Sequence, residues 1–374
     1  MSRRTFFRKL SYFMLPLVAL YALPLAVLVR SYEIAPVSII AARHSRDRAT
    51  AVYGPAYGNP DKGYKLASIA AHEASIVAVG TSRIMQFRSD FFTDGEREFY
   101  NAGGVVSRLF DYRALFRKLR GQRARRAIVN FDPWMFNEAW PDFGPDPGVM
   151  REYEMDYSTL DVIQRSLRVY PDTVSGKLDL GLLFSARDGF GVNGITHGNG
   201  FRRDGSYRYE DFLRNPKSSA DYEFKDTLER IRSCTRRFER GDGASLRALA
   251  ELDALATQWE RDGFEIVAFL PPYAPTVVRA MRASGAHAWV FAVTDAVRGI
   301  FERHHVPFVD LTTCGEIGCV DADFVDGFHG GTILYARFAI ALSTLTPWLA
   351  AAVDRPGLER RLEAHGMVWE LEDP

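Results

Sequence analysis

The chain contains little cysteine and no net charge, and both shortages exclude classes of protein. Only three of its 374 residues are cysteines, so no disulfide framework holds the fold. There is no Cys-x-x-Cys pair, and neither a metal site nor a cofactor is expected. The 47 lysines and arginines balance 47 aspartates and glutamates. Because a neutral chain has no general attraction for a polyanion, a nucleic-acid partner is not expected.

The longest uncharged run lies near the N-terminus. Residues 10–29 contain no charged side chain, and four basic residues precede them, namely Arg3, Arg4, Arg8 and Lys9. A bilayer core requires about 17–25 mainly apolar residues, and flanking basic residues stay in the cytoplasm. We therefore expect residues 1–30 to form a cytoplasmic tip and one transmembrane helix, with the remaining chain extracytoplasmic. A cleaved signal peptide is the alternative, because it also begins with basic residues.

After this segment, short β-branched runs alternate with helical patterns. Strands are predicted at residues 75–80, 98–101, 127–132, 265–270 and 307–311. Helices are predicted at residues 106–119, 244–262, 277–304 and 332–352. This alternation is typical of an α/β fold whose central parallel sheet is covered on both faces. Ligands of such sheets bind at the carboxyl ends of the strands.

Two stretches interrupt the alternation. Residues 31–73 contain several glycines and prolines and are expected to form a spacer that packs on the domain. Residues 141–234 are rich in charge, tyrosine and glycine, and we expect an insertion that folds across the active edge and shapes substrate access. His197 and Asn199 within it could contact substrate or simply form a turn. The α/β domain itself is expected over residues 74–352, followed by a tail at 353–374.

Two short motifs carry candidate chemistry. A Gly-Thr-Ser-Arg motif at 80–83 places Ser82 directly after the first predicted strand, and an Asp-Gly-Phe-His motif at 326–329 precedes the last predicted helix. A serine on a strand-to-helix turn can expose its Oγ, and Asp326 could orient His329 as the base that deprotonates it. Taken singly, each motif is better explained by a solvated turn or a surface histidine. The edge of a parallel sheet would bring them together.

Backbone donors could complete this site. An Asn-Ala-Gly-Gly motif at 101–104 follows the second predicted strand. The N–H groups of Ser82 and Gly104 could then stabilise an oxyanion that develops during acyl transfer. A tight turn that needs positive φ also explains the glycines, and the two interpretations are compatible.

Four further residues beyond strand ends are candidates for substrate binding. Arg83 could hold an anionic group of the substrate, or it could pair with Asp132 by a charge-assisted contact. Trp134 and Tyr273 could stack on sugars or acyl groups, or they could pack beneath the insertion.

The cysteines allow one bridge. In an oxidising compartment, Cys314 and Cys319 could close a small loop ahead of Asp326, and Cys234 would then stay free.

The motifs at 80–83, 101–104 and 326–329 resemble, in sequence and order, the blocks of the SGNH, or GDSL-like, hydrolase superfamily. The resemblance covers about residues 74–119, 127–137 and 265–352. It implies a flavodoxin-like three-layer fold in which Ser82 is the nucleophile, His329 the base, Asp326 its orienting partner and Gly104 an oxyanion donor. The third block departs from the pattern, because Asp132 stands where the superfamily has an asparagine that donates to the oxyanion, and a carboxylate cannot donate.

The membrane-anchored branch of this superfamily includes the lipoteichoic acid D-alanylation and alginate O-acetylation proteins. The resemblance thus implies a serine acyltransferase or esterase that is anchored in the inner membrane and faces the periplasm. Its substrate would be the O-acyl groups of an envelope or exported polysaccharide, and O-acetyl groups are the favoured choice. Its partners would be the envelope glycan, an acyl donor and a membrane-bound O-acyltransferase. Two alternatives stay open, a noncatalytic glycan-binding or envelope-assembly protein and a secreted soluble lipase.

Overall fold

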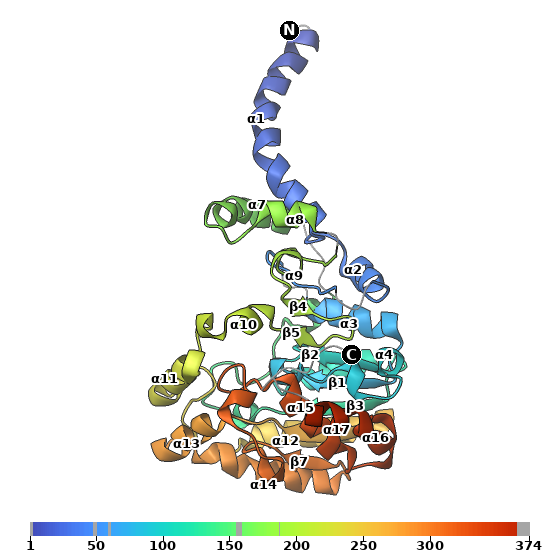
Figure 1. Cartoon of the computed structure of the whole chain (residues 1–374), viewed down its shortest axis with the longest axis vertical. Helices are drawn as coiled ribbons and strands as arrows, with labels where there is room; N and C mark the ends of the chain where they lie inside the picture. The colour runs from blue at the N-terminus through green and yellow to red at the C-terminus, as the bar shows by residue number, and fades with distance from the viewer. Residues whose placement is uncertain (1–2, 48–50, 59–60, 155–158, 187, 365–374) are drawn as a thin grey trace.

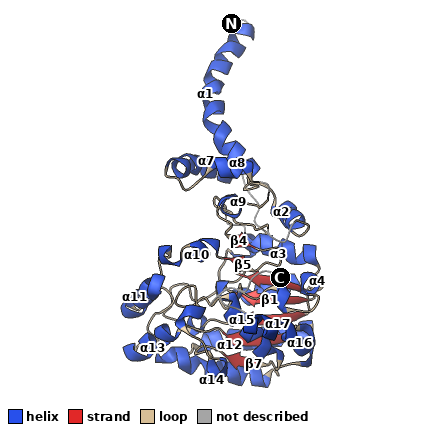
Figure 2. Ribbon diagram, in the orientation of Figure 1, coloured by secondary structure: helices blue, strands red, loops and turns tan. Residues whose placement is uncertain are grey.

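Five parallel strands form the central sheet of the computed structural model, which describes residues 3–47, 51–58, 61–154, 159–186 and 188–364. In chain order the strands are β1 (Ile76–Gly80), β2 (Phe99–Gly103), β3 (Arg126–Asn130), β6 (Glu265–Leu270) and β7 (Phe308–Asp310). In space their order is β2-β1-β3-β6-β7, and every neighbouring pair is parallel. Figure 2 shows these strands together on the side of the molecule away from the N-terminal helix. The predicted α/β class and parallel sheet are confirmed.

The strand order explains where the sheet opens. From β1 the chain first adds β2 on one side and then β3 on the other, so the direction of strand addition reverses between β1 and β3. All five residues of β1 are buried, as its run of Ile, Val and Ala requires for a strand covered on both faces. A crevice forms at the carboxyl ends of the strands where such a reversal occurs.

Helices from the α/β region pack around this sheet. They are α4 (Gly95–Glu98), α5 (Asp111–Leu119), α12 (Leu246–Asp262), α13 (Pro275–Ser284), α14 (Ala288–Arg303), α15 (Thr332–Ser343), α16 (Pro347–Ala352) and α17 (Arg355–Ala364). Aromatic rings join α5, α12 and α14, because Trp259 contacts both Phe116 and Phe301, with ring centroids 5.2 and 6.4 Å apart. These rings belong to one continuous hydrophobic core.

Two predicted helices are each divided into two. The helix expected at 277–304 is interrupted because Gly285 adopts a φ of +67° and ends α13, a conformation that favours glycine. The helix expected at 332–352 ends at Ser343, and α16 then begins at Pro347, whose missing N–H suits a first helical turn and not a helix interior. Helix α17 lies where a tail was expected, and its Leu358 is buried. Residues 365–374 of that expected tail lie outside the described residues.

Helix α1 (Arg3–Arg30) extends away from the α/β domain (Figure 1). It has 28 residues, and an 18-residue stretch within it has a mean hydropathy of 2.2, so it is long and apolar enough to cross a membrane. The following segment forms α2 (Val37–His44) and α3 (Asp61–His72). Tyr64 and Lys65 of α3 are buried, which ties this segment to the rest of the protein.

The stretch expected to be an insertion is built of short elements. They are α6 (Val149–Tyr153), α7 (Thr159–Val174), α8 (Leu180–Ser185), α9 (Val192–Thr196), β4 (Gly200–Phe201), β5 (Tyr207–Arg208), α10 (Glu210–Arg214) and α11 (Lys225–Ser233). Figure 1 shows that α7, α8 and α9 lie between α1 and the central sheet, whereas α10 and α11 lie beside the sheet. The insertion therefore reaches from the base of α1 to the region of the candidate site.

Candidate active site

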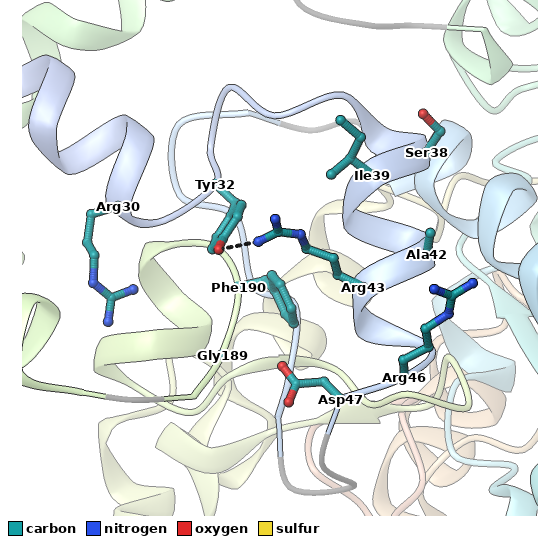
Figure 3. Close-up of a pocket in the computed structure, with 10 residues that line it drawn as sticks. All are labelled: Arg30, Tyr32, Ser38, Ile39, Ala42, Arg43, Arg46, Asp47, Gly189 and Phe190. Atoms are coloured by element: carbon teal, nitrogen blue, oxygen red, sulfur yellow. Dashed lines mark hydrogen bonds between the residues drawn. The ribbon is translucent and has the colours of Figure 1, made fainter.

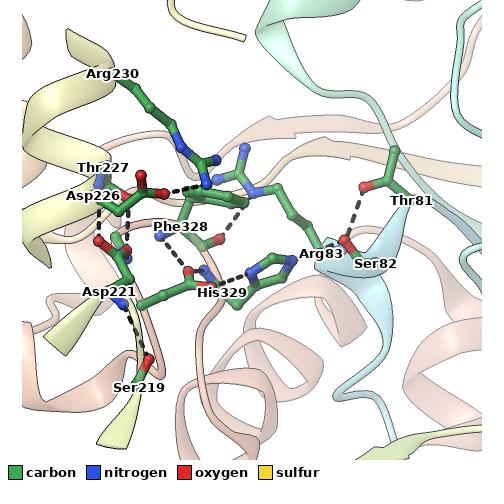
Figure 4. A network of polar contacts seen from close by, with 12 residues as sticks. Thr81, Ser82, Arg83, Ser219, Asp221, Asp226, Thr227, Arg230, Phe328 and His329 are labelled. Carbon is green, nitrogen blue, oxygen red and sulfur yellow. Dashed lines mark hydrogen bonds and ion pairs between the residues drawn. The ribbon is translucent and has the colours of Figure 1, made fainter. Parts of the chain in front are cut away.

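The loops that follow β1 and β7 bring three candidate catalytic side chains into contact. Ser82 opens the short 3-10 helix η1 (Ser82–Ile84), and its Oγ lies 2.8 Å from Nε2 of His329. Nδ1 of the same ring lies 2.7 Å from Oδ2 of Asp326. Figure 4 shows the ring of His329 near Ser82. The arrangement has the contacts of a serine nucleophile, its general base and an orienting carboxylate.

Asp326 is held in place by the backbone of its own loop. Its Oδ1 accepts the N–H groups of Phe328 and His329 at 2.9 and 2.8 Å. Burial alone would raise the pKa of Asp326, but the imidazole of His329 and these N–H donors outweigh it and hold that pKa below its usual value. An ionised Asp326 keeps a proton on Nδ1 of the ring, which leaves Nε2 free to accept the proton of Ser82.

The turn that carries Ser82 depends on a side chain from the neighbouring strand. The N–H of Thr81 donates to Oδ1 of Asn130 at 3.1 Å, and the N–H of Arg83 donates to Oγ1 of Thr81 at 3.2 Å. A Cβ at Gly80 would lie 1.5 Å from Oδ1 of Asn130, so only glycine fits there. Sequence reasoning missed the role of Asn130, although its place at the end of a predicted strand beside Asp132 was a usable signal.

Arg83 lies beneath the site and not in it. Its side chain is 0% exposed and donates to the carbonyl oxygens of Phe328 and Pro271 at 2.9 and 3.0 Å, to that of Pro272, and to Asp132 Oδ1 at 3.0 Å. It thereby joins the nucleophile turn to the loop of His329. The expectation that Arg83 contacts substrate is wrong, and the alternative of a pair with Asp132 is confirmed.

The other three substrate-binding candidates surround this guanidinium. The guanidinium carbon of Arg83 lies 4.3 Å from the ring centroid of Tyr273 and 5.4 Å from that of Trp134. Asp132, Trp134 and Tyr273 are all buried. Burial raises the pKa of Asp132, and the charge of Arg83 opposes that rise. These residues support the turn of Ser82 from within, so their assignment to substrate binding is corrected.

Only part of the expected oxyanion hole is available. Gly104 has a φ of +86°, as expected of a tight turn, but its N–H donates to the carbonyl of Gly80 at 2.9 Å. This bond continues the ladder between β1 and β2, so Gly104 cannot donate to an oxyanion in this conformation. Within the described chain, the N–H of Ser82 has no hydrogen-bond acceptor. The assignment of Gly104 is corrected, and Ser82 is the one expected donor that remains free.

A pocket of about 850 Å³ opens onto Ser82 and Asp326. Residues of the insertion form most of its wall, including His197, Asn199 and Tyr209. The ring of Tyr209 lies 6.5 Å from that of His329. This lining agrees with the expectation that the insertion shapes access to Ser82. His197 and Asn199, whose roles the sequence left open, both line the pocket.

The insertion also holds the loop that carries His329. Oδ2 of Asp221 accepts the N–H of Gly327 at 2.9 Å and the hydroxyl of Thr227 at 2.6 Å (Figure 4). A Cβ at Gly327 would lie 2.5 Å from Cγ2 of Thr227, so this glycine permits close packing of the loop on α11. Nothing in the local sequence indicated the role of Asp221, because its partner lies 106 residues away along the chain.

Cys314 and Cys319 form a disulfide ahead of Asp326, as the sequence allowed, and Cys234 is free. Among residues 3–47, 51–58, 61–154, 159–186 and 188–364, no group of three or more His, Cys, Asp or Glu side chains is placed to hold a metal ion.

No model of a known protein family matches the chain, and no curated protein matches it either.

Proposed function

We propose that the chain is a serine-dependent acyltransferase or esterase. The observation that carries this proposal is the continuous path from Ser82 Oγ through the ring of His329 to Asp326, with contacts of 2.8 and 2.7 Å at the edge of an open pocket. His329 would remove the hydroxyl proton as Ser82 attacks an ester carbonyl, and would return it to the leaving alcohol. The acyl-serine would then pass its acyl group to water or to a sugar hydroxyl.

An SGNH-like architecture is part of this proposal. Numbered in chain order, the five strands of the sheet follow the spatial order 2-1-3-4-5, which is that of flavodoxin-like doubly wound folds. In such folds ligands bind where the strand order reverses, and Ser82 follows β1 at that point. The topology and the position of Ser82 support a flavodoxin-like three-layer SGNH fold.

The proposed substrate is an O-acylated polysaccharide of the cell envelope, and the acetyl group is the favoured acyl group. Tyr207, Tyr209 and Asn199 give the pocket aromatic faces beside polar groups, a combination that suits sugar rings and hydroxyls. A membrane anchor would hold this pocket near a membrane-bound acyl donor, such as a membrane-bound O-acyltransferase. The disulfide between Cys314 and Cys319 supports an oxidising, extracytoplasmic location for the domain.

The test compares wild type, Ser82→Ala and Ser218→Ala, with the full chain in detergent micelles. Ser218 also lines the pocket, but its hydroxyl donates to the carbonyl of Asn215, so it is a matched control. We expect wild type and Ser218→Ala to hydrolyse p-nitrophenyl acetate and to react with a fluorophosphonate probe, and Ser82→Ala to do neither. Labelling that persists in Ser82→Ala would contradict the nucleophile assignment.

The oxyanion hole favours a second candidate, a noncatalytic glycan-binding protein. The N–H of Gly104 is already bonded to Gly80, and Asp132 cannot act as the missing side-chain donor. Each lost donor typically costs about 10²–10³ in turnover. A wild-type protein that neither hydrolyses the ester nor reacts with the probe, but binds an envelope polysaccharide equally well with and without Ser82, would establish this candidate.

A further inference from the structure

Helix α7 carries an exposed apolar stripe that no described segment covers. Leu160, Ile163, Leu167 and Val174 are 62%, 43%, 52% and 88% exposed. At 3.6 residues per turn, the four positions fall within about 60° of arc on one face of the helix. Leu182 and Phe184 of α8 add two more exposed apolar side chains, 43% and 48% exposed. An apolar surface of this kind beside a polar arc is typical of a binding surface.

The stripe lies beside the helix that is long enough to cross a membrane. The hydroxyl of Tyr170 on α7 donates to the carbonyl of Leu20 on α1 at 2.6 Å. Val169 of α7 and Leu183 of α8 share a hydrophobic cluster with Val27 and Leu28 of α1. Figure 1 shows α7 and α8 lying across the end of α1 that joins the domain.

The length of α1 decides what covers the stripe. Residues 10–19 of α1 are all exposed and extend for about 15 Å, whereas a bilayer core is about 30 Å thick. The uncharged run reaches this thickness only if it also includes residues 20–29, which is where α7 and α8 pack. Both short helices must then lie at the depth of the leaflet nearer the domain.

A basic pocket lies at the level where this uncharged run ends. Arg30, the first charged residue after the run, lines a pocket of about 610 Å³ together with Arg43, Arg46 and one acidic residue, Asp47, so the arginines outnumber the carboxylates three to one (Figure 3). Arg43 donates to the hydroxyl of Tyr32 at 2.6 Å. Guanidinium groups at this level suit lipid phosphates, which lie at the boundary of the hydrocarbon core.

We propose that α7 and α8 form a second membrane element, an interfacial helix pair whose apolar stripe is buried in the leaflet nearer the α/β domain. The occupant of the stripe is lipid, and the arginine pocket faces the headgroups of the same leaflet. This inference rests on the proposed membrane span of α1 and is independent of the chemistry of Ser82.

The test places a bimane fluorophore at single cysteines in the full chain, reconstituted in vesicles of phosphatidylcholine and phosphatidylglycerol. Cys234, the free cysteine, is first replaced by serine. Leu167→Cys reports on the stripe and Leu15→Cys on α1. Leu246→Cys is the matched control, because Leu246 is 84% exposed at the start of α12, away from α1 and α7. Each label is exposed to aqueous iodide and to lipids with a nitroxide high or low on the acyl chain.

We expect the label at Leu167 to lose roughly half of its emission to the shallow nitroxide and to be shielded from iodide, as an interfacial position would be. The label at Leu15 should respond to the deep nitroxide, and the label at Leu246 only to iodide. If iodide quenches the label at Leu167 as strongly as the label at Leu246, the stripe faces water and the proposal is overturned. If neither iodide nor the nitroxide lipids quench the label at Leu167, a protein surface covers the stripe, and the proposal is overturned as well. A silent Leu15 would overturn the span of α1 and this inference with it, but would leave the ester assay of Ser82 unaffected.

Discussion

Replacing Arg83 by methionine tests whether this residue supports the catalytic turn or contacts substrate. Methionine has a similar length but no charge and no donor, so it removes the ion pair with Asp132 and the three bonds to backbone carbonyls. The carboxylate of Asp132 would then be buried without a cationic partner, since its side chain is 0% exposed.

The expected loss of stability follows from that burial. Removing one partner of a buried ion pair costs about 3–5 kcal/mol. For a chain of this length, such a loss lowers Tm by roughly 4–7 °C. Because Arg83 also joins the Ser82 turn to the carbonyl of Phe328, beside His329, a displacement of about 1 Å between the two loops should lower kcat about 10²-fold. KM should change little.

The double variant Arg83→Met/Asp132→Leu is the matched control. Replacing both charges by apolar side chains of similar size is often neutral, so the double variant should recover most of the Tm that the single variant loses. Thermal unfolding of the full chain in micelles, followed by tryptophan fluorescence, and p-nitrophenyl acetate kinetics would measure both effects. An unchanged Tm together with a raised KM for Arg83→Met would refute the structural role and return Arg83 to the substrate site.

Three further predictions follow from single contacts. Gly80→Ala should fold but lose about 10²-fold in kcat, because its Cβ would lie 1.5 Å from Oδ1 of Asn130 and would displace the turn of Ser82. Hydrolysis of the ester at the wild-type rate would show that the turn tolerates a side chain. Asp221→Ala should slow fluorophosphonate labelling several-fold, because the N–H of Gly327 loses its charged acceptor, and a hydrogen bond of this kind typically stabilises a fold by about 1.5–3 kcal/mol. Unchanged labelling would mean that the loop of His329 keeps its conformation without Asp221. Burial lowers the pKa of His44 from 6.5 to about 4, so between these pH values the unfolded chain binds a proton that the folded chain does not. The free energy of unfolding should therefore fall by roughly 3 kcal/mol as the pH drops from 6.5 to 4. The Tm of His44→Gln should fall less steeply than that of wild type over this pH range, and equal slopes would contradict the role of His44.

The parts of the fold that sequence could predict are those with a local cause. Inner strands of a parallel sheet are buried on both faces and leave short apolar runs, and all five predicted strands form, although the edge strand β7 is only half-buried. The contact between Ser82, Asp326 and His329 was also predictable, because Ser82 lies in a short motif directly after β1, and Asp326 and His329 share a short motif just ahead of α15. The breaks at Gly285 and Pro347 had a local cause as well, and the longer helical periodicity concealed them.

The parts that failed depend on contacts between distant segments. The pair of Arg83 with Asp132 was one of the expected alternatives, but the carbonyl of Pro271 lies 188 residues from Arg83, so no local pattern could show that this guanidinium is enclosed. The engagement of Gly104 depends on the register of β1 and β2, which a sequence motif does not specify.

The insertion connects helix α1 to the candidate active site. Its α7 packs on α1, its residues wall the pocket beside Ser82, and its Asp221 holds the loop of His329. If α7 and α8 lie in the leaflet as proposed, the pocket wall and the catalytic loop are attached to the bilayer through one segment of chain. The pocket would then have a fixed height and orientation above the lipid surface. If Ser82 is the nucleophile that we propose, such an arrangement suits an enzyme that accepts acyl groups from a membrane-bound donor better than one that hydrolyses soluble esters, and it therefore favours transfer over hydrolysis.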